Sequence, residues 1–248
     1  LRLKESSVVV VGGASGIGRE VARQLSAKGA ALAVADINFA GAEAVAAELV
    51  AAGGTAIAVE FDVADADQVS AGVVQTCREL GGLHILVHSA GIGVERDFLD
   101  TSLEEWQRII DVDLTGTFLT CQAAAREMVK GGYGRIVNLS STAGLVGSAT
   151  SAIYSMTKGG VRLFTKSTAI EVRARGYNIR CNSVHPGATE SPMQDDILAT
   201  SNMSPDEIKA YMETRNLLGR FGKPIDIAKA ILFLASNDSA FMTGSEVV

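Results

Sequence analysis

Cysteine, proline and aromatic residues are scarce in this chain of 248 residues, and no long apolar run interrupts it. The cysteines Cys77, Cys121 and Cys181 are far apart and lack the Cys-x-x-Cys spacing of zinc and redox sites. We therefore interpret them as small buried side chains of a protein in a reducing compartment. No apolar run approaches the roughly 18 residues of a membrane span, and no signal peptide is visible. These absences predict a cytoplasmic protein without a membrane partner.

Positive charge is also in short supply. The formal net charge is −6 and Lys and Arg form no cluster, which argues against nucleic acid and anionic membranes as partners. The 3 histidines are scattered without the spacing of metal ligands, so we expect no catalytic metal.

Apolar residues make up 47% of the chain and form short β-branched runs that alternate with longer helical patterns. The runs are continuously apolar, as expected for strands that are covered on both faces. We expect strands at Ser7–Val11, Ala31–Ala35, Ala56–Val59, Ile85–His88, Arg135–Ser140 and Ile179–Val184, and helices at Gly16–Lys28, Ala40–Ala52, Ala66–Leu80, Ser102–Val129, Ala152–Arg175 and Ile225–Ala235. This alternation predicts an α/β fold, with one doubly wound domain over residues 1–248 and a parallel β-sheet flanked by helices on both faces.

The stretch before the last expected helix is less regular. Residues 189–216 contain Pro192 and Pro205 and mix polar with apolar side chains. We expect an insertion here, either a lid over a substrate pocket or a plain surface loop.

Tyr154 and Lys158 stand four residues apart in the predicted helix Ala152–Arg175, and Ser141 lies thirteen residues before the tyrosine. The four-residue spacing puts the phenol and the ammonium on one helix face, one turn apart. A phenol beside a fixed cation can ionise well below its usual pKa of about 10. The pair could therefore accept the proton of an alcohol while hydride leaves the alcohol carbon, and that reaction needs a nicotinamide.

A glycine-rich turn follows the first expected strand directly and leads into a helix. In such a turn, glycines let the backbone approach a pyrophosphate, and free N–H groups at the helix start bind the negative charge. The position after a buried strand makes a Rossmann-type cofactor site the favoured interpretation over a purely structural turn. The candidate residues are Gly12, Ser15, Gly16, Ile17 and Gly18.

Asp36 ends the second expected strand, eighteen residues past Gly18. A carboxylate there can accept hydrogen bonds from a ribose hydroxyl and would repel a 2′-phosphate. One charge pair at about 4 Å is worth about 4 kcal/mol at an effective dielectric constant of about 20, before screening. The neighbouring Ile37 and Asn38 bring no compensating cation, so we expect NAD rather than NADP.

Six motifs, in their order and spacing, resemble the short-chain dehydrogenase/reductase family over essentially the whole chain. They are GGASGIG at Gly12–Gly18, Asp62-Val63, Ser89-Ala90-Gly91, Asn138-Leu139-Ser140-Ser141, Tyr154-Ser155-Met156-Thr157-Lys158, and Pro186-Gly187.

The resemblance implies roles for the matching residues. Tyr154 would be the acid and base, Lys158 would assist it and bind the nicotinamide ribose, and Ser141 would orient the substrate oxygen. Cofactor contacts would come from Ser15, Ile17, Asp36 and Ile37, from Asp62 and Val63 beside the adenine, from the backbone of Ser89, Ala90 and Gly91, and from Pro186, Gly187 and Thr189 at the nicotinamide end. The resemblance also implies a homotetramer or a dimer.

Three positions depart from the family pattern. Val11 replaces a usual threonine, which removes a hydroxyl that braces the glycine turn. His88 replaces a usual asparagine, and we expect it to be a packed or hydrogen-bonded strand residue rather than a catalyst. His185, next to Pro186, is not one of these three departures; we interpret it as structural, with substrate contact as the alternative.

Asp113 is the third departure, because relatives commonly carry Asn in the stretch Val112–Gly116, where it positions a water that links Lys to solvent. An amide both donates and accepts hydrogen bonds, whereas a carboxylate only accepts and carries charge. We expect Asp113 to pair electrostatically with Lys158 and weaken its effect on the Tyr154 proton. A helix position that faces solvent is the alternative.

The motifs favour an NAD-dependent oxidoreductase that interconverts a secondary alcohol and a ketone. A 3-ketoacyl reductase and a non-catalytic NAD-binding regulator or scaffold remain as alternatives. The charged run Glu95, Arg96 and Asp97 borders the expected substrate mouth or forms a solvated loop.

Overall fold

The computed structural model describes residues 3–93, 96–147, 151–200, 204, 206–210 and 216–248. In this part of the chain, seven parallel strands form one sheet in the order β3-β2-β1-β4-β5-β6-β7. The strands are β1 Ser7–Val11, β2 Ala31–Asp36, β3 Thr55–Glu60, β4 Ile85–His88, β5 Gly134–Leu139, β6 Ile179–Val184 and β7 Glu246–Val247. The order reverses between β1 and β4, which places a crevice at the carboxyl ends of these two strands.

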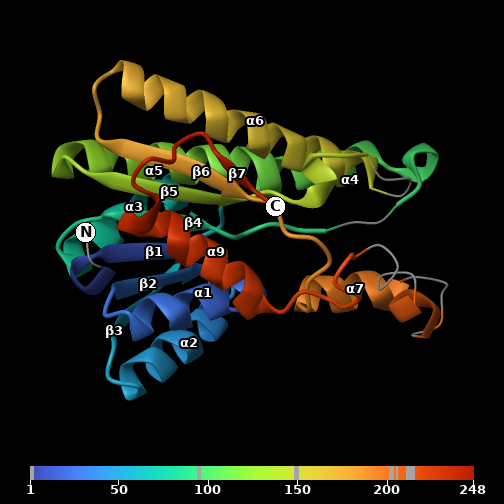
Figure 1. The fold of residues 1–248 in the computed structure, drawn as a ribbon, viewed down its shortest axis with the longest axis horizontal. Helices are drawn as coiled ribbons and strands as arrows, with labels where there is room; N and C mark the ends of the chain where they lie inside the picture. Colours follow the sequence, from blue (N-terminus) through green and yellow to red (C-terminus); the bar gives the residue numbers. More distant parts are fainter. Residues whose placement is uncertain (1–2, 94–95, 148–150, 201–203, 205, 211–215) are drawn as a thin grey trace.

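Helices cover both faces of the sheet (Figure 1). The helices of these layers are α1 Gly16–Ala27, α2 Phe39–Ala51, α3 Ala66–Leu80, α4 Leu103–Ile109, α5 Gly116–Gly131, α6 Ala152–Ala174 and α9 Pro224–Ala235, and a further helix is α7 Pro192–Thr200. One apolar core joins the sheet to α1, α2 and α9, and a second joins it to α3, α5 and α6. The predicted doubly wound α/β fold is therefore confirmed.

The expected strands are confirmed to within one residue at each end. Strands β1, β4 and β5 are buried along their whole length, because they lie inside the sheet between two helical layers. The short strand β7 was not predicted. Its two residues pair with Ser183 and Val184 and are too few to produce a sequence pattern.

The expected helix Ser102–Val129 is continuous in direction but not in type. Ser102 caps α4 in a capping box with Glu105, as its sequence indicates. A π-helical turn, Ile110–Thr115, then separates α4 from α5. The carbonyl of Asp113 in this turn accepts a 2.6 Å hydrogen bond from the Thr117 hydroxyl. Such turns insert an extra residue into a helix and often occur at functional sites.

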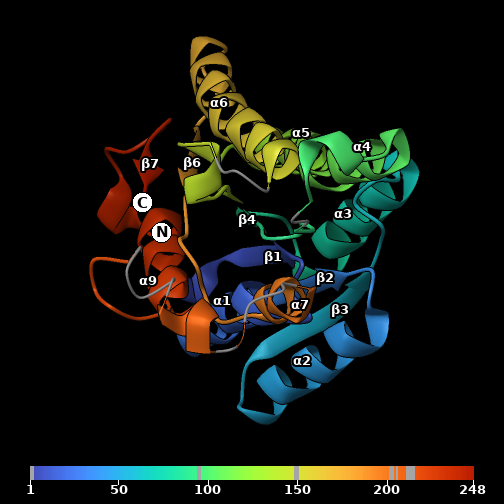
Figure 2. The same ribbon diagram turned by 90° about the vertical axis from the view of Figure 1, so that its right-hand side faces the viewer.

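The stretch 189–216 contains α7, which lies beyond the carboxyl edge of the sheet (Figure 2). Thr189 pairs with Gly222 in an isolated parallel bridge, and the Glu190 amide donates to the Gly222 carbonyl. The two ends of this insertion are thus joined. Among the described residues, no helix combines the length and the apolar character that crossing a membrane requires.

Candidate active site

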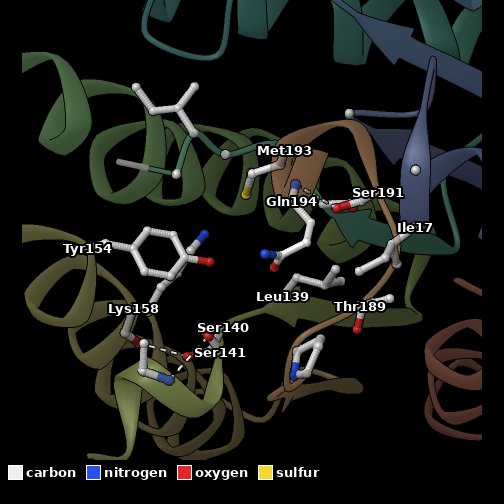
Figure 3. A pocket seen from close by; sticks show the side chains of 18 of the residues that line it. Ile17, Leu139, Ser140, Ser141, Tyr154, Lys158, Thr189, Ser191, Met193 and Gln194 are labelled. Atoms are coloured by element: carbon white, nitrogen blue, oxygen red, sulfur yellow. Dashed lines mark hydrogen bonds between the residues drawn. The ribbon is translucent and has the colours of Figure 1, made fainter. Parts of the chain in front are cut away.

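A cleft of about 2090 Å³ opens at the carboxyl edge of the sheet, and α7 lies against it. Residues from the ends of β1, β2, β4, β5 and β6 line this cleft together with α6 and α7 (Figure 3). The sequence candidates in its lining are Gly12, Ser15, Gly16, Ile17, Asp36, Ile37, Asp62, Val63, Ser89, Ala90, Gly91, Ser141, Tyr154, Lys158, Pro186, Gly187 and Thr189. Two candidates, Gly18 and Asp113, are buried and do not line the cleft.

Gly12 and Gly18 are required by close backbone approach. Gly12 has a φ of 76°, and a Cβ there would lie 2.6 Å from the Ala90 nitrogen. A Cβ on Gly18 would collide with the carbonyl of Gly12. Ser15 begins α1 with extended backbone and makes no side-chain cap bond. The Ser15 side chain therefore leaves the N–H groups in the first turn of α1 uncapped, and such groups can bind an anion.

Asp36 extends from the end of β2 toward this turn. One carboxylate oxygen accepts a 3.0 Å bond from the Ala14 amide, and the other accepts a 2.9 Å bond from the Asn38 amide. The carboxylate is thereby fixed at the rim of the cleft, beside the exposed Ile37.

The neighbouring part of the wall comes from the ends of β3 and β4. The Asp62 carboxylate accepts a 2.9 Å bond from the Ala64 amide, and Val63 packs against Gly116 at the start of α5. The Ser89 amide donates to the Val11 carbonyl, so the chain after β4 runs close to the glycine turn. Val11 itself is buried in the sheet core.

Tyr154 and Lys158 lie on the same face of α6, as their spacing predicts (Figure 3). The Lys158 Nζ lies 5.4 Å from the centroid of the Tyr154 ring. The Ser140 hydroxyl donates a 2.8 Å bond to the Lys158 carbonyl and so joins the end of β5 to α6. The Lys158 ammonium packs closely against Gly91, because a Cβ on Gly91 would lie only 2.9 Å from Nζ.

Asp113 contacts Lys158 directly. The Lys158 Nζ is 3.2 Å from Asp113 Oδ2, and the two side chains are 6% and 0% exposed. The other carboxylate oxygen accepts a 2.8 Å bond from the Ile92 amide. The alternative of a solvent-facing Asp113 is therefore wrong, because the π-helical turn directs this side chain into the protein.

The pair changes the acidity of the lysine. Burial alone lowers the pKa of the Lys158 ammonium. The negative charge of Asp113, and then that of Tyr154, raises the pKa, and together these charges outweigh the effect of burial. The net result is a pKa above the ordinary value for lysine. Lys158 is therefore a fixed cation beside Tyr154.

Ser141 lies at the end of β5, on the opposite side of the cleft lining from α7 (Figure 3). Its hydroxyl accepts a 3.1 Å bond from the Ala143 amide and caps a short helical turn, Thr142–Gly144. The hydroxyl hydrogen remains free to donate to a ligand in the cleft. Ser141, Tyr154 and Lys158 thus meet in one cavity, although they come from two separate elements.

The insertion contributes several cleft residues that the sequence did not reveal, among them Ser191, Met193 and Gln194. The Gln194 amide nitrogen is buried and has no hydrogen-bond partner among the described residues, and Figure 3 shows this side chain directed into the cavity. Gly93 packs closely against Met193 and Ile197. Part of the insertion therefore lines the cleft.

The two histidines near the site are buried and do not line the cleft. His88 Nδ1 bonds the Thr120 hydroxyl at 2.9 Å. Burial, and then the charge of Lys158, lower the pKa of His88 to about 3, so it is neutral. His185 is fully buried behind Ser141, which excludes the alternative of substrate contact.

The charged run after β4 is only partly described. Glu95 lies outside the described residues, and Arg96 forms a 2.7 Å ion pair with Glu105. Within the described chain, no three His, Cys, Asp or Glu side chains are grouped to hold a metal ion.

Comparison with known proteins agrees with this geometry. A family model described as "Enoyl-(Acyl carrier protein) reductase" matches residues 12–248. The cis-4-hydroxycyclohexanecarboxylate dehydrogenase of Sinomonas cyclohexanicum is 40% identical over 242 residues, which cover 97% of this chain and 93% of the relative. Cyclopentanol dehydrogenase of Comamonas sp. (strain NCIMB 9872) is 37% identical over 247 residues, covering 100% of this chain and 96% of the relative.

The solved structures include a short-chain type dehydrogenase/reductase from Mycobacterium marinum. It matches with a TM-score of 0.91 and 36% identity, and the match covers 100% of this chain and 95% of that protein. The chain described here belongs to the short-chain dehydrogenase/reductase family of oxidoreductases.

Proposed function

We propose that this enzyme oxidises an uncharged, apolar secondary alcohol with NAD and also catalyses the reverse reduction. The observation that carries the proposal is the meeting of Ser141, Tyr154 and Lys158 in the same cleft as the glycine turn and Asp36. A reacting group and a dinucleotide could both be held there.

The residues of the cleft fit NAD. Gly12 lets the turn pass close to the chain after β4, where a Cβ would collide with Ala90, and Asp36 is fixed beside this turn. The Asp36 carboxylate favours a free ribose hydroxyl and opposes a phosphate at that position. Asp62 and Val63 would flank the adenine, and Pro186, Gly187 and Thr189 would hold the nicotinamide end.

Tyr154 would act as the general base for alcohol oxidation and as the general acid for ketone reduction. When the alcohol hydroxyl gives its proton to ionised Tyr154, Ser141 donates a hydrogen bond to the substrate oxygen and keeps it in place. The Lys158 ammonium stabilises the tyrosine anion and binds the nicotinamide ribose. When bound, NAD supplies the hydride acceptor. Acid–base assistance of this kind is typically worth about 10²–10⁴ in rate.

The lining of the cleft supports an uncharged substrate. Its apolar residues include Val146, Met193, Leu217 and Leu218. Two of its cations are paired internally, Lys158 with Asp113 and Arg220 with Asp226 at 2.7 Å. Because the similar cyclopentanol dehydrogenase is named for a cyclic secondary alcohol, we propose a substrate of that class.

A substrate panel tests the proposal. Purified enzyme is mixed with cyclopentanol, cyclohexanol and open-chain secondary alcohols, with NAD and NADP in parallel, and reduced nicotinamide is followed by its absorbance. We expect turnover of the cyclic alcohols with NAD. Faster reduction of a 3-ketoacyl thioester with NADPH would instead favour a ketoacyl reductase. NAD binding without turnover of any substrate would favour a regulatory protein.

We also propose that the enzyme is a homo-oligomer. Large apolar side chains are exposed on α5 and α6, among them Phe118, Leu163 and Ile170. Exposed apolar surface on neighbouring helices often marks a protein–protein contact. A second copy of this chain is the proposed occupant.

A further inference from the structure

His185 lies directly behind the catalytic wall, where it contacts Ser141 without reaching the substrate. It follows β6, is 0% exposed and is absent from the cleft lining. Its Nδ1 lies 3.2 Å from the backbone carbonyl of Ser141, and its Nε2 lies 2.8 Å from the Ser183 hydroxyl. The imidazole therefore spans the ends of two neighbouring strands.

These contacts define which nitrogen carries the proton. The Ser141 carbonyl can only accept a hydrogen bond, so Nδ1 must donate. Burial lowers the pKa of His185, although the bond to Ser141 opposes that shift, so the ring is neutral at physiological pH. In the neutral ring Nε2 accepts the hydroxyl hydrogen of Ser183. Both ring nitrogens are thus satisfied, and the ring orientation is fixed.

The strand that carries His185 is itself tied to the helix that carries Tyr154. The His185 amide donates a 2.7 Å bond to the Val247 carbonyl of β7. The adjacent Glu246 is bound by Arg162 at 2.7 Å and by Lys166 at 2.6 Å, and both of these come from α6. A route of direct contacts therefore runs from α6 through β7 and His185 to Ser141.

We propose that His185 is a positioning residue that sets the place of Ser141 relative to Tyr154. The inference rests on the proposed function, because Ser141 matters only if its hydroxyl holds the reacting oxygen. A second bond, from the Thr142 amide to the Pro186 carbonyl at 3.0 Å, fixes the chain beyond Ser141. The Ser141 carbonyl accepts a 2.9 Å bond from the nearby Gly144 amide as well as the bond from His185, and His185 is the donor that ties this carbonyl to the end of β6. A displacement of about 1 Å at such a position can lower the rate about 10²-fold.

Two amide variants test separately the hydrogen bonds made by the two ring nitrogens. In His185→Asn the side-chain amide nitrogen takes the place of Nδ1 and can still donate to the Ser141 carbonyl. In His185→Gln the amide takes the place of Nε2, so the contact with Ser183 is kept and the contact with Ser141 is lost. We expect His185→Asn to keep kcat within about threefold and His185→Gln to lower it roughly 10- to 100-fold. The dissociation constant of NAD should stay the same in both variants.

A double-mutant cycle with Ser141→Ala gives the decisive result. If His185 acts through the Ser141 hydroxyl, adding His185→Gln to Ser141→Ala should lower kcat no further. The proposal would be overturned if the loss of kcat in the double variant equalled the product of the two single losses, or if His185→Asn and His185→Gln had equal kcat values. Either result would indicate general structural damage. Melting temperatures of all four proteins show whether loss of activity follows loss of stability. A fully active Ser141→Ala enzyme would instead contradict the proposed function itself.

Discussion

The Lys158 ammonium and the Asp113 carboxylate form an ion pair of 3.2 Å that is almost completely closed to solvent. Taking two charges out of water is costly, and removal of one partner from a buried pair typically destabilises a protein by about 3–5 kcal/mol. Asp113 therefore does more than fill space beneath the active site. Its charge raises the pKa of a lysine that burial alone would lower.

Asp113→Asn should move the alkaline limb of the rate profile to lower pH. The substitution removes the charge that raises the pKa of Lys158 and leaves the burial that lowers it. If turnover needs protonated Lys158, the wild-type enzyme should keep its activity to a higher pH than the variant. The measurement is kcat for ketone reduction as a function of pH.

Asp111→Asn is the matched control, because Asp111 lies in the same π-helical turn but its carboxylate accepts a bond from Gln107 at the cleft edge instead of pairing with Lys158. Its profile should coincide with that of the wild type. Coincident profiles for Asp113→Asn and the wild type would reject the electrostatic role.

Tyr154→Phe should abolish turnover while NAD binding persists. The ring still packs beside Lys158, but the hydroxyl that takes the alcohol proton is gone, and the expected loss in kcat is at least about 10²-fold. Stopped-flow turnover and a fluorescence titration with NAD measure the two properties. Tyr177→Phe, on a residue outside the cleft lining, serves as the control. Substantial activity in Tyr154→Phe would place the proton acceptor elsewhere.

Asp36 should make the enzyme prefer NAD to NADP by at least about 100-fold in kcat/KM, which corresponds to about 2.7 kcal/mol. Asp36→Ala should reduce this preference at least tenfold, because the charge that opposes a 2′-phosphate is removed. NAD binding should also weaken, since the Ala14 amide loses its acceptor. Asp62→Ala is the control and should lower kcat/KM for both cofactors by the same factor. An unchanged ratio of kcat/KM for NAD and NADP in Asp36→Ala would show that the selectivity arises from another residue.

The wild-type protein should sediment as a dimer or tetramer. Leu163 and Ile170 on α6 are 65% and 71% exposed in the single chain, and a second copy would cover them. Leu163→Glu combined with Ile170→Glu should shift the sedimentation coefficient to that of a monomer, with the circular dichroism of the fold unchanged. A monomeric wild-type protein would contradict this prediction.

Much of the architecture could be predicted because its signals are local. The strands β1 and β2 follow from apolar runs at residues 8–11 and 31–35, and the pairing of Asp113 with Lys158 was expected from the unusual carboxylate at that position. The glycine turn was recognisable because its close backbone contacts require glycine at fixed positions in the sequence. At Gly12, for example, a side chain would collide with Ala90.

Other features depend on contacts between distant segments and left no signal in the sequence. Ile110–Thr115 has the apolar spacing of an ordinary helix, so the π-helical turn was not predicted. Ser191 and Gln194 reach the cleft because α7 folds back over it, which the mixed composition of the insertion does not indicate. The position of His185 behind Ser141 depends on the pairing of β5 with β6.

The Thr189–Gly222 bridge holds together the two ends of the stretch that carries α7. Closing both ends of the intervening stretch against each other means that its length and sequence can vary at little entropic cost to the sheet. Under the proposed function, relatives of this chain could change their substrate specificity by changing that stretch. For the same reason, the stretch could be exchanged between members of the family by protein engineering.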